Sequence, residues 1–245
     1  MRVAVISDIH GNMNALESVM ADYQLQGCER VLCLGDLAMA GPQPNEVLDY
    51  VVNKTQNWTI IQGNTDKMIV DFDISMYEKL GKSFPIMAHA LLDDADIIKA
   101  EYKEFLSELP EKKQLVIEGV TVLMVHGSPR RINEDILPNM RISEIQEMIE
   151  GETADLILCG HTHVPCGYQT LTKQTVVNVG SVGRPMTGIP KANYAIIDFN
   201  NGSFTVEHRE VEYDYNKAAE LIQQRNFEGA EELSNQLIMP LLRHL

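Results

Sequence analysis

The chain has 245 residues, of which 44% are hydrophobic, and it carries a formal net charge of −15 from 35 acidic and 20 basic residues. This length suffices for one sizeable core with an insertion, and the composition is that of an ordinary globular protein. The acidic balance argues against a general binder of nucleic-acid duplexes or anionic membranes, because phosphate backbones demand a basic face. A small phosphorylated substrate remains compatible if metal cations neutralise its phosphate.

The sequence shows no targeting or membrane segment. No signal peptide precedes the first apolar run, and no run approaches the roughly 18 residues of a membrane span. The four cysteines form no Cys-x-x-Cys pair, and Cys33 and Cys159 lie in apolar runs, so we expect buried free thiols. We therefore expect a cytoplasmic protein, either a monomer or a homo-oligomer.

The first part of the chain alternates between short apolar runs and helical patterns, which is typical of βαβ units. Apolar runs at 3–6, 30–34 and 58–61 predict buried strands. A helix with one apolar face follows the first strand, and 46–54 reads as a second helix. These features predict an α/β fold whose sheet is largely parallel.

The alternation stops after the third strand. Residues from about 67 to 110 contain two or three helical stretches and no convincing strand, and the clearest stretch runs from about 84 to 109. We interpret this segment as a helical insertion that packs over the strand ends. Its Tyr77, His89 and Tyr102 are compatible with substrate contact, but core packing is the better explanation.

Strands resume in the second half of the chain. The expected elements are a hairpin at 113–118 and 120–125, a helix at 143–149, a strand at 155–159, a hairpin within 165–178, and a hairpin at 194–199 and 204–211. A helical tail covers about 215 to 242. No repeat or linker divides the sequence, so we expect a single domain over 1–245.

Five of the predicted strands end in side chains that bind metal ions. These are Asp8 with His10, Asp36, Asn64, His126, and His161 with His163. Side chains at the carboxyl ends of neighbouring strands converge in an α/β sheet. Each position alone has an ordinary explanation as a helix cap or a turn histidine, but their joint occurrence after five strands does not. We therefore predict a metal centre, and we interpret His89, His208 and His244 as ordinary histidines.

The number and chemistry of these ligands favour two divalent ions. Seven nitrogen and oxygen ligands exceed what one ion needs, and a carboxylate such as Asp36 can bridge two ions. A mixed Asp, His and Asn set favours manganese or iron, with zinc as a further option, over magnesium or a structural zinc. Bridged ions about 3.5–4 Å apart are the usual apparatus for displacement at phosphorus.

The order of these motifs resembles that of the calcineurin-like metallophosphoesterase family. The motifs are Asp8-x-His10, Gly35-Asp36, Gly63-Asn64-x-Asp66, His126-Gly127 and Gly160-His161-x-His163, and the likeness extends from Val3 to about Asp198. Small prokaryotic phosphodiesterase-type members are the closer resemblance, through Gly-Pro-x-Pro-Asn-Glu at 41–46, His-Gly-Ser-Pro and Gly-Ser-Val-Gly. The resemblance implies an αββα two-sheet sandwich rather than a plain doubly wound sheet.

The resemblance also implies how the ligands divide between two metal ions. One ion would be held by Asp8, His10, Asp36 and His163. The other would be held by Asp36, Asn64, His126 and His161, with Asp36 as the bridge. Asp36, Asn64 and His126 are then also the candidate catalytic residues, while Asn12 and Arg184 are candidate substrate contacts.

The implied activity is that of a hydrolase, a metal-dependent phosphoesterase in which a metal-bound hydroxide attacks phosphorus in line. We expect phosphodiester or nucleotide-anhydride substrates, with dinucleoside polyphosphates as a named candidate. The alternatives are a phosphomonoesterase or protein phosphatase, and a non-catalytic metal-binding scaffold. A scaffold would favour degraded ligands, and here all seven positions keep metal-binding side chains.

The sequence departs from the wider family at two places. Many members have a histidine where Thr65 stands, and that histidine is proposed to protonate the leaving group. A threonine hydroxyl is far too weak an acid for this role near neutral pH. The second departure is at Val179, Arg184 and Met186, where relatives often show Asn-Pro-Gly-Ser-Val-Gly-Gln-Pro-Arg. Arg184 either restores a phosphate-facing charge or is a plain surface arginine.

Overall fold

The computed structural model describes residues 1–243. Its elements are β1 (Arg2–Ile6), α1 (Met13–Leu25), β2 (Arg30–Cys33), α2 (Pro44–Lys54), β3 (Trp58–Ile60), α3 (Asn64–Val70), α4 (Ile74–Gly81), α5 (Pro85–Ile97), α6 (Ala100–Glu108), β4 (Lys112–Ile117), β5 (Val120–Val125), α7 (Ile142–Met148), β6 (Leu156–Cys159), β7 (Cys166–Gln169), β8 (Thr175–Asn178), β9 (Lys191–Asn200), β10 (Ser203–Glu212), α8 (Tyr215–Gln224) and α9 (Ala230–Ile238).

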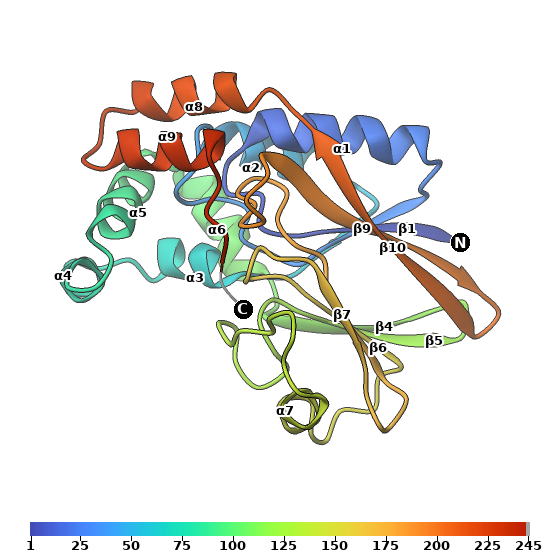
Figure 1. Ribbon diagram of the computed structural model, residues 1–245. Coiled ribbons are helices and arrows are strands. Elements are labelled where there is room, and N and C mark those ends of the chain that lie inside the picture. Colours follow the sequence, from blue (N-terminus) through green and yellow to red (C-terminus); the bar gives the residue numbers. More distant parts are fainter. Residues whose placement is uncertain (244–245) are drawn as a thin grey trace.

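Within these residues the strands form two five-stranded sheets that lie face to face (Figure 1). The strand orders are β10-β9-β1-β2-β3 and β4-β5-β6-β8-β7. Helices α1 and α8 lie on the outer side of the first sheet, and α7 lies on the outer side of the second. The αββα two-sheet sandwich is confirmed.

Each sheet is mixed rather than largely parallel. In the first sheet β1, β2 and β3 run parallel, whereas β9 is antiparallel to β1 and β10 to β9. In the second sheet β5, β6 and β8 run parallel, and β4 and β7 pair antiparallel at the edges. The parallel strands of each sheet therefore deliver their carboxyl ends to one edge, which is where such folds place their sites.

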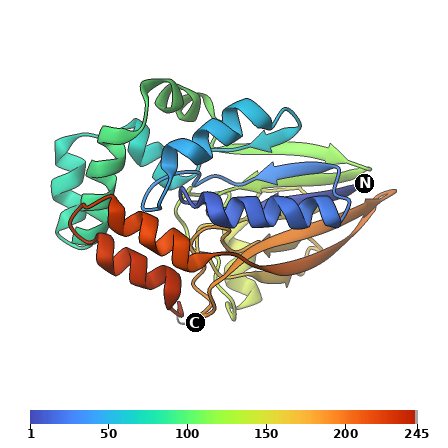
Figure 2. The same ribbon diagram turned by 90° about the horizontal axis from the view of Figure 1, so that it is seen from above.

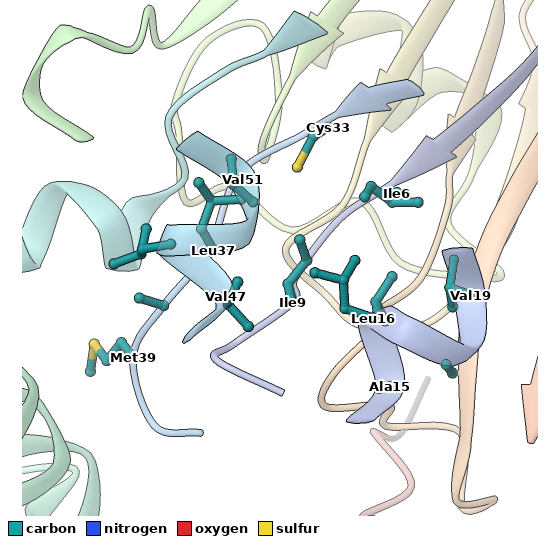
Figure 3. Close-up of a cluster of buried hydrophobic side chains, with 14 of the residues drawn as sticks. Ile6, Ile9, Ala15, Leu16, Val19, Cys33, Leu37, Met39, Val47 and Val51 are labelled. Atoms are coloured by element: carbon teal, nitrogen blue, oxygen red, sulfur yellow. The ribbon is translucent and has the colours of Figure 1, made fainter. Parts of the chain in front are cut away.

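Two cores explain why the strands are apolar along their whole length. On β1, Val3 and Val5 belong to the core between the sheets. Their neighbours Ala4 and Ile6 belong to the core under the helices. Successive side chains of a strand point to opposite faces, so a strand buried on both faces reads as an unbroken apolar run. Figure 3 shows Ile6 in the core under the helices, beside side chains of α1 and α2.

The four cysteines are free in the structure. Cys28, Cys33 and Cys159 are buried, and Cys166 is partly buried. Burial raises the pKa of the Cys33 and Cys159 thiols, so both stay protonated near neutral pH.

Helices of the inserted segment and of the tail lie together at one end of the sandwich (Figure 2). The segment contains four helices, α3 to α6, rather than two or three. The stretch expected as one helix over 84–109 is divided, because the backbone is extended at Ile98 and Lys99. Asn45 of α2 supports this break: its amide donates to the Ile97 carbonyl at 3.0 Å and accepts from the Lys99 N–H at 3.2 Å. In the tail, α9 contacts both α8 and α5.

Across residues 1–243 no helix is long and apolar enough to cross a membrane. The cytoplasmic location and the oligomeric state stay predictions.

Candidate metal centre

The predicted ligands converge at the edge where the carboxyl ends of the parallel strands meet. Two groups of buried side chains each bring potential ligand atoms within 4.8 Å of one another. One group is Asp8, His10 and His163, and the other is Asp8, Asp36 and His126. Asn64 and His161 line the same cavity as His10, Asp36 and His163.

Apolar anchors between the ligands direct them away from the core. Ile9 stands between Asp8 and His10, and Leu37 follows Asp36. Both anchors are fully buried in the core under the helices, as Figure 3 shows. Because an anchored residue fixes the backbone on either side of it, the flanking ligands are left to face the strand edge.

Five of the seven predicted ligands have left-handed backbone conformations. Their φ angles are 56° for Asp8, 47° for His10, 54° for Asp36, 66° for His161 and 61° for His163. This conformation costs about 1–2 kcal/mol for a residue with a Cβ, and such strain clusters at functional sites. Backbone hydrogen bonds sustain it by joining the loops: the Asp8 N–H donates to Gly35 at 3.0 Å, and the His10 N–H donates to Asp36 at 2.9 Å.

Three histidines are held with Nε2 free to bind a metal ion. Nδ1 lies 2.9 Å from the Met39 carbonyl in His10 and 2.7 Å from the Leu34 carbonyl in His126. In His163 it lies 2.6 Å from the Arg184 carbonyl. A carbonyl only accepts, so Nδ1 carries a proton, and Nε2 is the ring nitrogen that faces the centre, as in metal-binding histidines.

The spacing of the ligand atoms fits shared metal ions. The Nε2 atoms of His10 and His163 lie 3.0 Å apart, and Asp8 Oδ1 lies 3.2 Å from His163 Nε2. Two ligand atoms about 2.1 Å from one ion lie roughly 3.0–3.4 Å apart. Two facing lone pairs repel each other, and a cation on their shared side turns this repulsion into attraction.

Three predicted ligand atoms are among the buried side-chain polar atoms that have no hydrogen-bond partner within residues 1–243. They are Asp8 Oδ1, Asn64 Oδ1 and His126 Nε2. Leaving a buried polar atom unsatisfied costs about 1–3 kcal/mol, so such atoms are rare without a reason. These three come from three different strand ends, and all are good metal ligands, so the residues present fit a metal site.

The charges of the centre favour metal binding too. Burial opposes ionisation of Asp8, but His163 and His10 hold its pKa well below the usual value. Burial likewise opposes ionisation of Asp36, and His126 outweighs it, lowering the pKa of Asp36 to about 2. Both carboxylates are therefore ionised at neutral pH, as ligands of a divalent cation must be.

The comparisons with known proteins agree with this geometry. Residues 1–202 match the calcineurin-like phosphoesterase superfamily domain. The chain belongs to this superfamily. It is therefore a metal-dependent phosphoesterase, and the predicted family and enzyme class are confirmed.

Individual relatives span most of this phosphoesterase. It is 32% identical over 237 residues to the uncharacterized protein MJ0912 of Methanocaldococcus jannaschii, covering 90% of this chain and 91% of that protein. It is 23% identical over 206 residues to phosphodiesterase YfcE of Escherichia coli K12, covering 81% of this chain and 88% of YfcE. The crystal structure of a metallophosphoesterase from Sphaerobacter thermophilus has a TM-score of 0.77 at 25% identity, covering 98% of this chain and 99% of that one.

Asp66 braces the metal-binding loops of the phosphoesterase, a role that its place in the motif did not reveal. Its buried carboxylate accepts from the backbone N–H of Asp36 at 2.8 Å, of Leu37 at 2.9 Å and of Gly63 at 3.0 Å. A Cβ at Gly63 would clash with the Asp36 carboxylate, so the close approach of these loops requires glycine there. The signal in the sequence was a carboxylate at the first turn of α3.

His161 lies at the rim of the centre and has a partner that the sequence did not indicate. Its Nε2 is 3.2 Å from Asp135 Oδ1, and Asp135 also pairs with Arg243 at 2.6 Å. The backbone N–H of His161 donates to Asp8 Oδ2 at 3.0 Å, and its ring lies beside that of His126. Neither of the two ligand groups found within residues 1–243 includes His161, so its assignment as a ligand stays a prediction.

Two further predicted residues differ in their surroundings. Asn12 is fully buried as the N-cap of α1, where it accepts from the Ala15 N–H at 3.1 Å and donates to the Gly183 carbonyl at 2.9 Å. These bonds give Asn12 a structural role, so we do not propose it as a substrate contact. Arg184 lines the cavity beside the metal centre rather than the outer surface.

Thr65 and the remaining histidines lie in structural positions. The Thr65 hydroxyl donates to the Ala38 carbonyl at 3.1 Å, and its backbone N–H donates to Asp36 at 2.8 Å. His89 lies 3.4 Å from Glu228, and His208 lies 2.8 Å from the Asn178 carbonyl. His244 lies outside the described residues.

Proposed function

We propose that this phosphoesterase uses two divalent ions to hydrolyse phosphodiester or nucleotide phosphoanhydride bonds. The observation that carries the proposal is the position of Asp36 between two sets of histidines. Asp36 Oδ2 lies 3.7 Å from Nε2 of His10 and 3.4 Å from Nε2 of His126. A carboxylate between two imidazoles whose Nε2 atoms face it is suited to bridge two ions.

In this proposal the ligands divide as the family resemblance implies. One ion takes Asp8, His10, Asp36 and His163, and the other takes Asp36, Asn64, His126 and His161. The unpartnered Asn64 Oδ1 and His126 Nε2 support the second set. Asp8 Oδ1 lies 3.7 Å from His10 Nε2, as Asp36 Oδ2 does, and 3.9 Å from His126 Nε2. Only the 3.4 Å distance from Asp36 Oδ2 to His126 Nε2 favours Asp36 over Asp8 as the bridge. The oxygen and nitrogen donors favour manganese or iron, with zinc as a further option.

When bound, the two ions supply an activated water and neutralise charge on the phosphoryl group. The chain itself contributes Arg184, whose guanidinium lies in the cavity beside the metal ligands. Burial lowers the pKa of Arg184 to about 10, so the side chain stays positively charged near neutral pH. We assign Arg184 to binding a phosphate oxygen of the substrate.

The shape of the site supports a small substrate rather than a phosphorylated protein. The cavity has a volume of about 580 Å³ and is walled by the insertion and the tail. A volume in this range is typical of small-molecule sites. The likeness to a protein named phosphodiesterase supports diesters among such substrates.

The decisive experiment loads metal-free protein with Mn²⁺, Fe²⁺, Zn²⁺ or Mg²⁺ and measures hydrolysis across a substrate panel. The panel contains monoesters, diesters, cyclic nucleotides, dinucleoside polyphosphates and a phosphopeptide. We expect two ions per chain and turnover of diesters or anhydrides. One ion per chain at full activity would contradict the dinuclear centre, and preferred hydrolysis of the phosphopeptide would contradict the substrate class.

A further inference from the structure

The cavity at the metal centre is lined by two chemically different sets of residues, which we call the polar floor and the apolar wall. The polar floor is formed by His10, Asp36, Asn64, Thr65, His161 and His163. The apolar wall is formed by Phe84, Pro85, Ile86, Met87, Met186, Leu233 and Leu241. A phosphate group would contact only the polar floor, so the apolar wall is suited to contact a second, less polar part of the substrate.

The apolar wall is built from parts of the chain that are far apart in sequence. Ile86 at the start of α5 packs against Gly229 at the start of α9. Arg184 joins these two helices, since its guanidinium contacts Met87 Sδ at 3.3 Å and donates to Gln236 Oε1 at 2.9 Å. The Arg243 N–H donates to the Met186 carbonyl at 3.1 Å, which fastens the last described residue of the tail to the same side. Arg184 thus stands where the polar floor meets the apolar wall.

We propose that the apolar wall binds a planar heteroaromatic ring of the substrate, such as a nucleobase, while its phosphate lies on the polar floor. The proposal rests on the proposed function for the phosphate end only. Phe84 lines the cavity and leaves 62% of its surface exposed, so its ring is open to stacking. Met87 and Met186 add thioether sulfurs, which make favourable contacts with aromatic rings.

Polar groups on the same side favour a heteroaromatic ring over an alkyl chain. Gln236 and Ser83 line the cavity among the apolar residues. An alkyl chain would remove water from these groups and replace none of their hydrogen bonds, whereas ring nitrogens and exocyclic groups supply partners. The charges are complementary as well, because Arg184 and the metal-binding floor would face the anionic phosphate of a substrate whose ring lies on the apolar wall.

The test measures binding of phosphonates that cannot be hydrolysed, by calorimetry on the metal-loaded protein. The compounds share one head group and differ in the attached group: methyl, octyl, or a purine on a short alkyl arm. We expect the purinyl phosphonate to bind at least tenfold more tightly than the methyl compound and more tightly than the octyl compound. Equal binding of methyl and purinyl phosphonates, or tighter binding of the octyl compound, would overturn the proposal.

Variants of the apolar wall sharpen this test. Phe84→Ala should reduce the purinyl affinity about five- to tenfold, as expected for loss of one aromatic pair, and leave methylphosphonate binding unchanged. Phe84→Trp should bind the purinyl phosphonate as tightly as wild type does. Leu171→Ala, at an exposed turn between β7 and β8, is the matched control and should change neither. An unchanged purinyl affinity in Phe84→Ala would contradict the ring contact, whereas failure of every phosphonate to bind would contradict the metal-dependent phosphate site itself and overturn both proposals.

Discussion

The buried ion pair between Asp94 and Arg225 makes the stability of this phosphoesterase depend on pH in a direction that can be tested. Asp94 of α5 has no exposed surface, and its carboxylate accepts from the Ala40 N–H at 2.8 Å and from Arg225 at 2.8 Å. Arg225 also donates to Gly41 and to Asp93. Burial raises the pKa of Asp94 from its usual 3.8 to about 6, against the opposing attraction of Arg225.

The sign and size of the effect follow from proton linkage. Between these two pKa values the folded state holds the Asp94 proton and the unfolded chain has released it. The unfolded state therefore binds fewer protons, and the free energy of unfolding falls as pH rises. A difference of about 2 between the folded and unfolded pKa values of Asp94 contributes about 3 kcal/mol to the free energy of unfolding at pH values below both. About 2 kcal/mol of this contribution is lost between about pH 4.5 and pH 7.5.

Asp94→Asn removes the titration and keeps the side-chain shape and an acceptor for the Ala40 N–H. We expect the free energy of unfolding of wild type, relative to this variant, to fall by about 2 kcal/mol between about pH 4.5 and pH 7.5. Urea unfolding of both proteins, with metal chelated, measures this difference in the free energy of unfolding. Groups that titrate alike in wild type and variant cancel when the two values are subtracted. Asp96→Asn, at an exposed position of the same helix, is the control. A wild-type-minus-variant difference that stays constant with pH would refute the reasoning.

Three further predictions concern the metal centre. Asp36→Asn should lower both metal content and activity, as elemental analysis and turnover will measure, whereas the distant His89→Ala should lower neither; a full metal complement in Asp36→Asn would exclude the bridge. Gly160→Ala should weaken Mn²⁺ binding in calorimetric titrations, because a Cβ there would lie 2.5 Å from Asp8 Oδ2. Since Thr65 supplies no strong acid, rates for a homologous ester series should fall by up to about tenfold per unit of leaving-group pKa. A flat dependence would show that another group donates the proton.

Local chemistry made much of the fold predictable. The Asn-Gly turn expected between 194–199 and 204–211 is present, with φ angles of 45° at Asn201 and 83° at Gly202. A tight hairpin requires positive φ at both central positions, which is why this pair is a strong signal. Ligands directly after apolar strands were equally visible, because strand ends and turn residues are encoded within a few positions.

Pairing between distant segments could not be predicted from the residues alone. The alternating first half indicated a largely parallel sheet, but β9, which follows every other strand except β10, pairs antiparallel with β1. Hydrophobic periodicity reports burial and not the partner strand, so only the family resemblance indicated two sheets. The break at Ile98 was hidden for the same reason, since the side chain that supports it belongs to α2.

The same limit applies to the site. Every predicted ligand sits in a short motif, whereas Asp135, Arg243 and Gln236 stand in segments without any recognisable pattern. Gln236 and Arg243 acquire their roles because α9 packs against α5 of the insertion and both residues line the cavity. A residue whose function depends on a contact with a segment far along the chain leaves no local signal.

The insertion does more than wall the cavity, because it also supports a metal ligand. His10 is oriented by the Met39 carbonyl, and both Met39 and Ala40 have left-handed backbones, with φ of 76° and 61°. The Asp94 carboxylate of the insertion accepts from the Ala40 N–H, and Arg225 of the tail donates to the Gly41 carbonyl. Strained backbone persists only where its surroundings hold it, so removing the insertion should loosen His10 as well as the apolar wall. Deleting the whole segment therefore cannot separate substrate preference from metal binding, and point substitutions in the apolar wall are the variants that can.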